Sequence, residues 1–587
     1  MDLLRTQLDL EESDFPDDSD LPIALSGLFI EATKRDTDKY TLDQVHKAVL
    51  AAQLSGEIDP LSAVPVLLPS SDDTARDVLD TIAENTSAKE LVIACEEATE
   101  RLKTNLLSAS DEEDDDFESM ASDEVLQPSP AQQVVRLLRI YAKALPRLKL
   151  VKRSPSQIIK PIFPEIDLLI RFLGQNAEVE DSRALVAAVS HLVLSLAPWV
   201  ALDSEDKVAS SNSLYNLMIS TIEVCAESVS TGIAQGAFEK QFPRLRMPAT
   251  REEASVKHTL DDPAKDALHA LAEIGFAIPT FEKHAGIATL VLLSHTTPYT
   301  PSISVVQTFL PVLIASIQTN TALEATLAFL LSALGPLSLP SNTSDLPTDL
   351  IVPLAHVLPP LAGAHPDAPL RHIIFRLLAR VLALAHPTLR FRILHELLTD
   401  GDSQDDVYGT GVGEVDGTSA QMRVAAVGLV REAVLDALIE AKAGKERENV
   451  FASPKFMQTF APVVFRPRLP EGAGVDGRRA LEEFLASPEP LRLVEGLGLY
   501  YVVLQRDTEN LTGIRDAESL RNAEKELLSP LRSRIAAWNK VAKLDHDDDD
   551  ADDDDFSHDT LQLGILEMWL DRIRGAIDSL RVNTAEY

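Results

Sequence analysis

The sequence HELLT, residues 395–399, is the stretch that comes nearest to catalytic chemistry, because it begins like the zinc-binding pattern of metalloproteases. That pattern needs two histidines four residues apart, which share one face of a helix and hold the metal together. Residue 399 is threonine, so the second ligand is missing. The thirteen histidines are scattered, and we expect those in apolar helical segments, His191, His269 and His295, to be ordinary core or surface residues. We therefore predict no metal site.

Two glycine-containing stretches could hold a phosphate group, but neither has the required spacing. GTGVGEVDG (409–417) places Glu414 or Asp416 where a glycine is needed, and its carboxylates would repel a phosphate. The Gly-Lys pair at 444–445 lacks the upstream glycine and the following Ser or Thr of a P-loop. The chain also has no G-x-S-x-G nucleophile elbow. We predict a protein that is not an enzyme and that uses no cofactor and no small-molecule substrate.

Cys95 and Cys225 are the only cysteines, so neither a disulfide framework nor a cysteine-based metal site can form. One bridge between two thiols is conceivable, but isolated thiols more often pack as small apolar side chains. Neither cysteine lies in a C-x-x-C pair, which argues against a redox relay within this chain. We expect a cytoplasmic protein, with the nucleus kept open as a second compartment.

The charge of the chain is strongly negative, because 92 Asp and Glu against 54 Lys and Arg give a formal net charge of −38 at pH 7. Negative charge repels phosphate backbones and anionic lipid surfaces, so we predict neither nucleic acid nor a membrane as a partner. A basic surface on another protein is the complementary partner. Such attraction raises association rates in a salt-dependent way.

One uncharged stretch, residues 285–323, raises the question of a membrane span. The segment HTTPYTPS (295–302) interrupts it, and neither half reaches the roughly 18–20 continuous apolar residues that a span needs. The start of the chain, MDLLRTQLDLEESDFPDD, is acidic and lacks the basic region of a signal peptide. We expect the uncharged stretch to form buried helices.

The elements that would position any site are predicted to be helices. Hydrophobic residues make up 45% of the chain and aromatic residues 5%, with Leu, Ala and Val dominant, which suits helix-on-helix packing. Apolar residues recur three and four positions apart along most of the chain, which is the period of an amphipathic helix. The helix predicted at 419–441 has one apolar stripe, made of Val424, Val427, Val430, Val434 and Leu438.

From about residue 300 onward the predicted helices come in pairs. The first helices of four pairs begin near residues 304, 349, 389 and 454. The first two steps are typical of HEAT and armadillo repeats, and the third is longer because a Gly/Asp-rich loop is inserted. Pro311, Pro353 and Pro462 lie inside the first helices and predict kinks there. We predict an all-α fold, an irregular HEAT/armadillo-like helical-repeat solenoid with disordered acidic loops.

Two acidic runs are predicted to be disordered, because their mutual repulsion opposes folding. The second contains nine Asp within residues 545–555. The amphipathic helix predicted at 558–582 would cap the last helix pair, since a bare repeat end exposes apolar surface. The predicted regions are an N-terminal helical region (1–107), an acidic linker (108–130), helical repeats (131–400), a Gly/Asp loop (401–418) and C-terminal repeats (419–587) with the acidic loop 545–555 and the capping helix 558–582.

The stretch YYVVLQRDTENLTGI (500–514) is the most unusual charged cluster, because an apolar helix passes directly into Arg506, Asp507, Glu509 and Asn510. Asn and Gly tolerate the left-handed conformation that ends helices, and an arginine in the last turn suits the negative end of the helix dipole. The same dipole disfavours the two acids. Either they pair with nearby arginines in a structural helix end, or they face a partner.

This C-terminal region resembles the glomulin family, which joins fungal YAP-binding proteins, plant aberrant-lateral-root-formation proteins and animal glomulin. The resemblance covers roughly residues 300–585, including RFRILHELL (390–398) and MRVAAVGLVREAV (422–434). The family pattern is an apolar helix, an Arg/Lys-Asp-x-Glu-Asn tract, Thr-Gly, and a Leu-x-Pro-Leu helix. The residues that match it in order are Arg506, Asp507, Glu509, Asn510, Thr512, Gly513, Leu528, Pro530 and Leu531.

The resemblance implies a HEAT-like protein without catalytic activity, and two protein partners follow from different branches of the family. Animal glomulin binds the RING-box subunit of cullin-RING ubiquitin ligases and limits their activity. Fungal YAP-binding proteins act in the oxidative-stress response, where they bind an AP-1-like transcription factor and promote its oxidation. We take the first as our main hypothesis and the second as the alternative.

An adaptor in nuclear transport or trafficking is a third hypothesis, from another class, because acidic HEAT-type solenoids often serve there. For any of these functions we expect the partner to contact the C-terminal region. The residues expected to contact it are Arg506, Asp507, Glu509, Asn510, Trp569 and Arg572.

Overall fold

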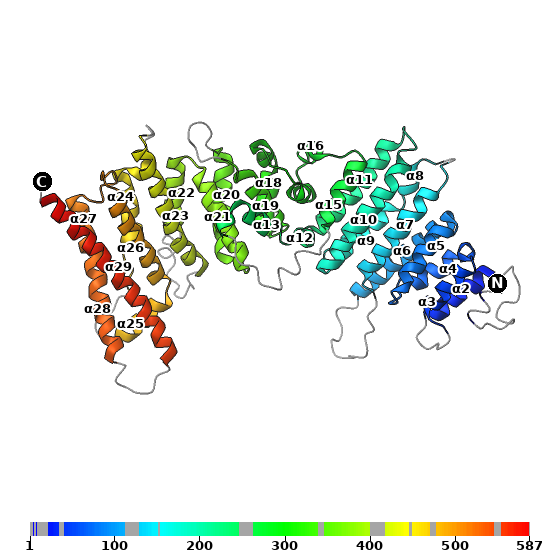
Figure 1. Cartoon of the computed structure of the whole chain (residues 1–587), viewed down its shortest axis with the longest axis horizontal. Coiled ribbons are helices and arrows are strands. Elements are labelled where there is room, and N and C mark those ends of the chain that lie inside the picture. Colours follow the sequence, from blue (N-terminus) through cyan, green and yellow to red (C-terminus); the bar gives the residue numbers. More distant parts are fainter. Residues whose placement is uncertain are drawn as a thin grey trace. The chain divides into compact units, whose positions relative to one another are not determined.

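The computed structural model describes Leu4, Leu8 and residues 21–33, 40–111, 128–150, 153–245, 262–337, 346–399, 417–444, 449–469, 477–544 and 553–585. Within these ranges every regular element is a helix, which confirms the predicted all-α class (Figure 1). The chain divides into two compact units, Met1–Ala333 and Leu334–Tyr587. The predicted regional boundaries do not coincide with this division.

The helices of the first unit are mostly α-helical, with short 3₁₀ turns labelled η. Their bounds are α2 (Leu21–Ala32), α3 (Leu42–Ala51), η3 (Ser55–Glu57), α4 (Pro60–Leu67), α5 (Thr74–Asn85), α6 (Ala88–Asp111), α7 (Pro130–Ala144), η4 (Leu145–Arg147), α8 (Pro155–Ile159), α9 (Phe163–Gly174), α10 (Val179–Val200), α11 (Lys207–Val224), α12 (Ala226–Val229), α13 (Ile233–Gln241), η5 (Pro243–Leu245), α15 (Pro263–Glu273), α16 (Ile278–Phe281), α17 (Ile287–His295), α18 (Ile303–Thr319) and α19 (Leu323–Leu334).

The second unit contains the remaining helices, and two of its short elements, η7 and η8, are π-helical turns. Their bounds are α20 (Thr348–Ala364), α21 (Ala368–Ala383), α22 (Pro387–Thr399), α23 (Gly417–Lys442), η6 (Val450–Ala452), α24 (Pro454–Phe460), η7 (Ala461–Phe465), α25 (Gly477–Ala486), α26 (Glu489–Arg506), α27 (Ala517–Ala523), η8 (Glu524–Leu528), α28 (Ser529–Leu544) and α29 (Asp553–Ala585).

The core of the first unit is built around α10, which packs against α7, α11 and α15. By length and composition alone α10 could cross a membrane, but 56% of its apolar window is buried inside the unit. Contacts with neighbouring helices therefore account for its hydrophobicity. The uncharged stretch 285–323 forms the separate helices α17 and α18 and the start of α19, as predicted.

In the second unit, helices that are neighbours in the chain pack side by side (Figure 1). α20 packs on α21 and α22 on α23, and α26 packs between α23 and α29. Pro353 lies inside α20 as predicted, while Pro462 falls in η7. The stripe predicted for 419–441 is buried at Val427, Val430, Val434 and Leu438, and Val424 is half-buried.

The last helix, α29, closes the second unit as the sequence predicts. Its apolar stripe packs against α26 and α28 and removes their hydrophobic faces from water. The buried residues of this stripe are Leu563, Leu566, Leu570, Ile573 and Ile577.

Arginines recur as caps on the C-terminal ends of neighbouring helices. The last carbonyls of a helix have no partner within it, and a guanidinium offers five donors and a positive charge to that negative end. Arg136 of α7 donates to the carbonyls that end α4, at Leu67, Leu68 and Ser70. Within the second unit, Arg380 of α21 donates in the same way to the carbonyls of Leu334, Gly335 and Leu337. In each unit these bonds join segments that are far apart in the sequence.

Three predicted boundaries need correction. The linker predicted at 108–130 is shorter, because α6 continues to Asp111 and α7 begins at Pro130, where Ser129 caps it by accepting the Gln132 N–H. The loop predicted at 401–418 gives way to α23 at Gly417, and the one at 545–555 to α29 at Asp553. Acidic residues suit a helix N-terminus, because its dipole is positive there. The central parts, 112–127, 401–416 and 545–552, lie outside the described residues.

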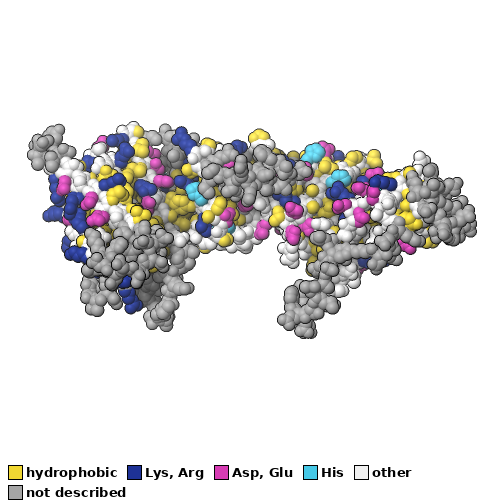
Figure 2. Space-filling model, turned by 60° about the horizontal axis from the view of Figure 1, so that its bottom comes forward, with side chains coloured by type: hydrophobic (Ala, Val, Ile, Leu, Met, Phe, Trp, Pro, Cys, Tyr) yellow, Lys and Arg dark blue, Asp and Glu magenta, His cyan; other side chains and the backbone are white. Residues whose placement is uncertain are grey.

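Acidic and basic side chains are interspersed on the face of the molecule that Figure 2 shows, where Lys and Arg lie among Asp and Glu. Part of the negative excess belongs to two runs outside the described residues, 112–127 with eight Asp and Glu and 545–552 with six. The net charge of −38 therefore does not mean that every described surface is acidic.

Candidate functional site

The turn that follows α26 is built around Asp507, which is 1% exposed. Its carboxylate accepts hydrogen bonds from the backbone N–H groups of Leu511 and Thr512, both at 2.8 Å, and from the Thr512 hydroxyl at 2.6 Å. Charged acceptors make the stronger kind of hydrogen bond, and here Thr512 is buried with the carboxylate. Asp507 is thus a structural residue, and the expectation that it contacts a partner does not fit its burial.

Asn510 and Arg515 complete this helix end. Asn510 has φ of 54°, and its side chain accepts the Arg515 N–H at 2.8 Å and donates to Asp516 at 2.7 Å. The Arg515 guanidinium donates to the Leu504 carbonyl at 2.7 and 3.1 Å, so it caps the C-terminus of α26. Most residues of the charged cluster therefore serve to end and cap α26.

Gly513 is required by the same turn. Its φ is +74°, a conformation that L side chains rarely adopt, and a Cβ there would lie 3.0 Å from Asp516 Oδ2. The Asp-x-x-Asn-x-Thr-Gly order at 507–513 therefore has a local physical explanation.

Arg506 and Glu509 differ from their neighbours, because both are exposed. Among the described residues, neither side chain has a hydrogen bond or an ion pair. They stand on the rigid frame that Asp507, Asn510 and Arg515 provide. These two predicted residues are therefore the ones that the turn leaves available to a partner.

Trp569 and Arg572 lie on α29. Neither has a described contact with the residues of the turn after α26. Trp569 is half-buried against α26, with its ring centroid 5.8 Å from that of Tyr501 and its edge over Gly498. Arg572 is exposed and stacks over the Trp569 ring at 5.3 Å. An aromatic ring beside an arginine is typical of interface centres.

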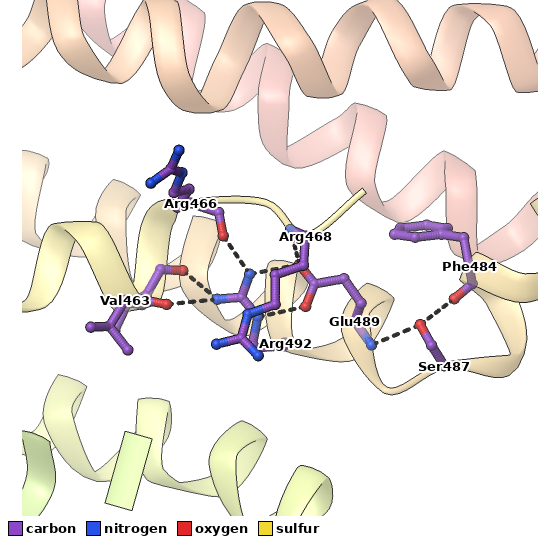
Figure 3. A network of polar contacts seen from close by, with 8 residues as sticks. Val463, Arg466, Arg468, Phe484, Ser487, Glu489 and Arg492 are labelled. Atoms are coloured by element: carbon purple, nitrogen blue, oxygen red, sulfur yellow. Dashed lines mark hydrogen bonds and ion pairs between the residues drawn. The ribbon is translucent and has the colours of Figure 1, made fainter. Parts of the chain in front are cut away.

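Arg492 forms a second polar centre at the start of α26 (Figure 3). Its guanidinium donates to the Glu489 carboxylate at 2.6 and 2.7 Å and to the carbonyls of Val463, Val464 and Arg466. Arg492 is 7% exposed and Glu489 is 9% exposed. The pair joins α26 to the end of η7, and every contact in it is internal, which indicates a structural role.

The structural roles of Arg492 and Arg515 were not predicted from the sequence. Helical periodicity does not show to which backbone carbonyls an arginine will donate. The only signals were their positions, one in the first turn of an apolar helix and one just after Gly513. His395, the histidine of the zinc-like stretch, packs its ring edge-on against Phe460 at 6.0 Å.

Comparison with known proteins bears on this C-terminal region. Residues 294–568 match the model of a family described as uncharacterised protein family, YAP/Alf4/glomulin. This segment belongs to the YAP/Alf4/glomulin family. The match includes the whole 506–531 tract that carries the resemblance and ends one residue before Trp569. No curated protein matches the chain. The family indicates a protein-binding regulator.

Both thiols of the chain are buried, Cys95 at 0% and Cys225 at 1% exposure. Burial raises the pKa of Cys225 to about 11 and that of Cys95 further still, so both stay protonated near neutral pH. Since the thiolate is the reactive form, both thiols should be inert in the folded chain.

We expect a thiol-reactive dye at about pH 7 to label neither cysteine in the native chain and both after denaturation in guanidinium chloride. Mass spectrometry of the labelled peptides distinguishes the two sites. Fast labelling of either thiol under native conditions would contradict the burial described above.

Proposed function

We propose that this protein is a non-enzymatic regulator that binds the RING-box subunit of cullin-RING ubiquitin ligases and limits their activity. The observation that carries the proposal is the match of residues 294–568 to the YAP/Alf4/glomulin family, together with the exposed, unpaired Arg506 and Glu509 on a rigid helix end. We place its action in the cytoplasm, with the nucleus as a second compartment.

The contact surface in this proposal is formed by Arg506 and Glu509, with Trp569 and Arg572 as a second contact on α29. The hydrogen bonds of the turn hold the backbone of Arg506 and Glu509 in place, so binding has to order only their side chains. A protein partner also fits the interspersed charges of the surface, because interfaces commonly pair charges of both signs at their rims.

The test is binding of the full chain to a purified RING-box protein at low and at moderate salt. The variant Arg506→Glu/Glu509→Lys reverses both exposed charges and leaves the net charge unchanged. A matched control, Lys160→Glu/Glu223→Lys, does the same at exposed positions of the first unit. We expect salt-sensitive binding that is about tenfold weaker in the first variant and unchanged in the second. Asp507 is unsuitable for this test, because replacing it would disturb the turn.

Absence of binding at low salt would reject the ligase proposal for this chain. The alternative is then a stress-response scaffold that binds an AP-1-like transcription factor and promotes its oxidation. With Cys95 and Cys225 buried, that scaffold would act by positioning thiols of other proteins. The same two variants assayed with such a factor would test it.

A further inference from the structure

The second unit contains a groove of about 460 Å³ that is lined in part by the turn after α26. One wall consists of α24 and η7, and the other consists of α27 and η8. Thr512, Gly513 and Asp516 also line it, so the turn after α26 helps to form the groove. Apolar side chains line its base, including Met457, Phe465 and Leu527. A volume of this size lies within the range of binding pockets and accommodates one or two large side chains.

Each wall of the groove contains a π-helical turn, η7 on one side and η8 on the other. Pro462 lies within the first, and Pro530 follows the second by two residues. Proline has no N–H and its ring crowds the carbonyl four residues earlier, so a widened turn relieves the clash. π-Helical turns are uncommon and are frequently found at functional sites.

Tyr500 of α26 lies at the base of the groove with an unsatisfied hydroxyl. The residue is 0% exposed, its ring packs edge-on against Phe465 at 5.3 Å, and the hydroxyl has no hydrogen-bond partner among the described residues. Burial, with a smaller effect of Glu524, raises the pKa of Tyr500, so the hydroxyl stays protonated and can donate. A buried donor without an acceptor is costly, which points to an acceptor that a ligand brings.

The rim of the groove is acidic. Asp516, Glu518 and Glu526 are exposed and border it, whereas Arg466 is the one cation among the described lining residues. One carboxylate oxygen of Asp516 already accepts from Asn510, and no described residue pairs with the side chain of Glu518 or Glu526. An apolar base with an acidic rim is complementary to an apolar side chain flanked by lysine or arginine.

We propose that this groove binds a short basic segment of a partner protein, which inserts one large apolar side chain between the two π-helical turns and places its Lys or Arg residues against Glu518 and Glu526. A backbone carbonyl of the segment accepts the Tyr500 hydroxyl. The proposal does not depend on the RING-box assignment, since none of Arg506, Glu509, Trp569 and Arg572 is among the residues that line the groove.

The probe is a fluorescent ten-residue peptide with one leucine flanked by two lysines on each side, titrated with the full chain and followed by anisotropy. A second peptide replaces leucine with serine and so keeps only the charge. We expect the leucine peptide to bind at least about tenfold more tightly than the serine peptide, and more weakly as salt rises. Equal binding of the two peptides would mean non-specific attraction to an acidic protein and would overturn the proposal.

Three variants locate the peptide. Glu518→Lys/Glu526→Lys should weaken binding about tenfold, whereas the control Glu223→Lys/Glu227→Lys, with the same charge change on the first unit, should leave it unchanged. Ala523→Trp fills the groove without changing charge and should abolish binding. Tyr500→Phe should weaken binding about fivefold while the chain stays at least as stable, because an unsatisfied donor is removed.

Unchanged binding to Ala523→Trp would place the peptide elsewhere and reject the groove. Binding blocked by Ala523→Trp but insensitive to Glu518→Lys/Glu526→Lys would show an apolar ligand and reject the basic segment. A dimer, detected by analytical ultracentrifugation, that dissociates in Ala523→Trp would show that a second copy of the chain occupies the groove, which also contradicts the proposal. None of these outcomes depends on a RING-box protein, so failure here leaves the ligase proposal standing.

Discussion

Replacing Arg492 with alanine is expected to lower the free energy of unfolding of the second unit by about 3–5 kcal/mol, the cost of breaking a buried ion pair. The substitution leaves the Glu489 carboxylate buried without its cation. It also removes the donor that the Val463, Val464 and Arg466 carbonyls share. A buried polar group without a partner costs more free energy than its hydrogen bond contributed in the native protein.

Chemical denaturation followed by tryptophan fluorescence measures this effect, since Trp538 and Trp569 lie in the second unit and Trp199 in the first. The matched control is Arg478→Ala, which removes an arginine that pairs with Glu482 at 3.1 Å on the exposed surface of the same unit. Exposed pairs contribute about 0–1 kcal/mol, so the control should change little. Equal effects of the two substitutions would show that the buried network adds no special stability.

Asp507→Ala is expected to destabilise the second unit by about 3 kcal/mol, because it leaves the Thr512 N–H and hydroxyl without their acceptor. The neighbouring Glu509→Ala removes an exposed carboxylate from the same turn and should stay within about 0.5 kcal/mol of the unmodified chain. Denaturation midpoints of the two variants give the comparison. Amide hydrogen exchange should also become faster at Leu511 and Thr512 in Asp507→Ala alone.

This pair of variants separates folding from recognition at the RDTENLTG stretch. In our interpretation, Asp507 affects a partner only through the shape of the turn, and Glu509 affects it directly. Asp507→Ala with native stability but lost partner binding would reverse these roles. Glu509→Ala with lost stability would show that an interaction of its side chain stabilises the helix end.

We expect the acidic runs to affect the rate of partner binding more than the place where the partner binds. Residues 112–127 and 545–552 carry fourteen Asp and Glu between them, eight and six respectively. Charge of this kind attracts a basic partner over about a Debye length, roughly 8 Å at physiological salt. The groove and the exposed pair Arg506 and Glu509 would then supply the specific contacts.

Most helices, their pairing and the family segment could be read from the sequence, because amphipathic periodicity is a local property and each helix buries its own apolar stripe. Helix α29 is an example, since its five stripe residues were readable and all are buried. Pro462 and Pro530 are also visible in the sequence. The sequence did not show that Pro462 lies in a widened turn instead of at a simple kink.

Which charged residues are functional candidates depends on how the chain folds beyond each helix. Arg506, Asp507, Glu509 and Asn510 lie within five residues of chain and are all polar, yet Asp507 is buried whereas Arg506 and Glu509 are exposed. Periodicity cannot separate them, because the choice depends on donors at Leu511, Thr512 and Arg515 beyond the end of the helix. The groove likewise joins segments 454–466, 500 and 512–527, and only long-range packing brings their apolar and acidic side chains together.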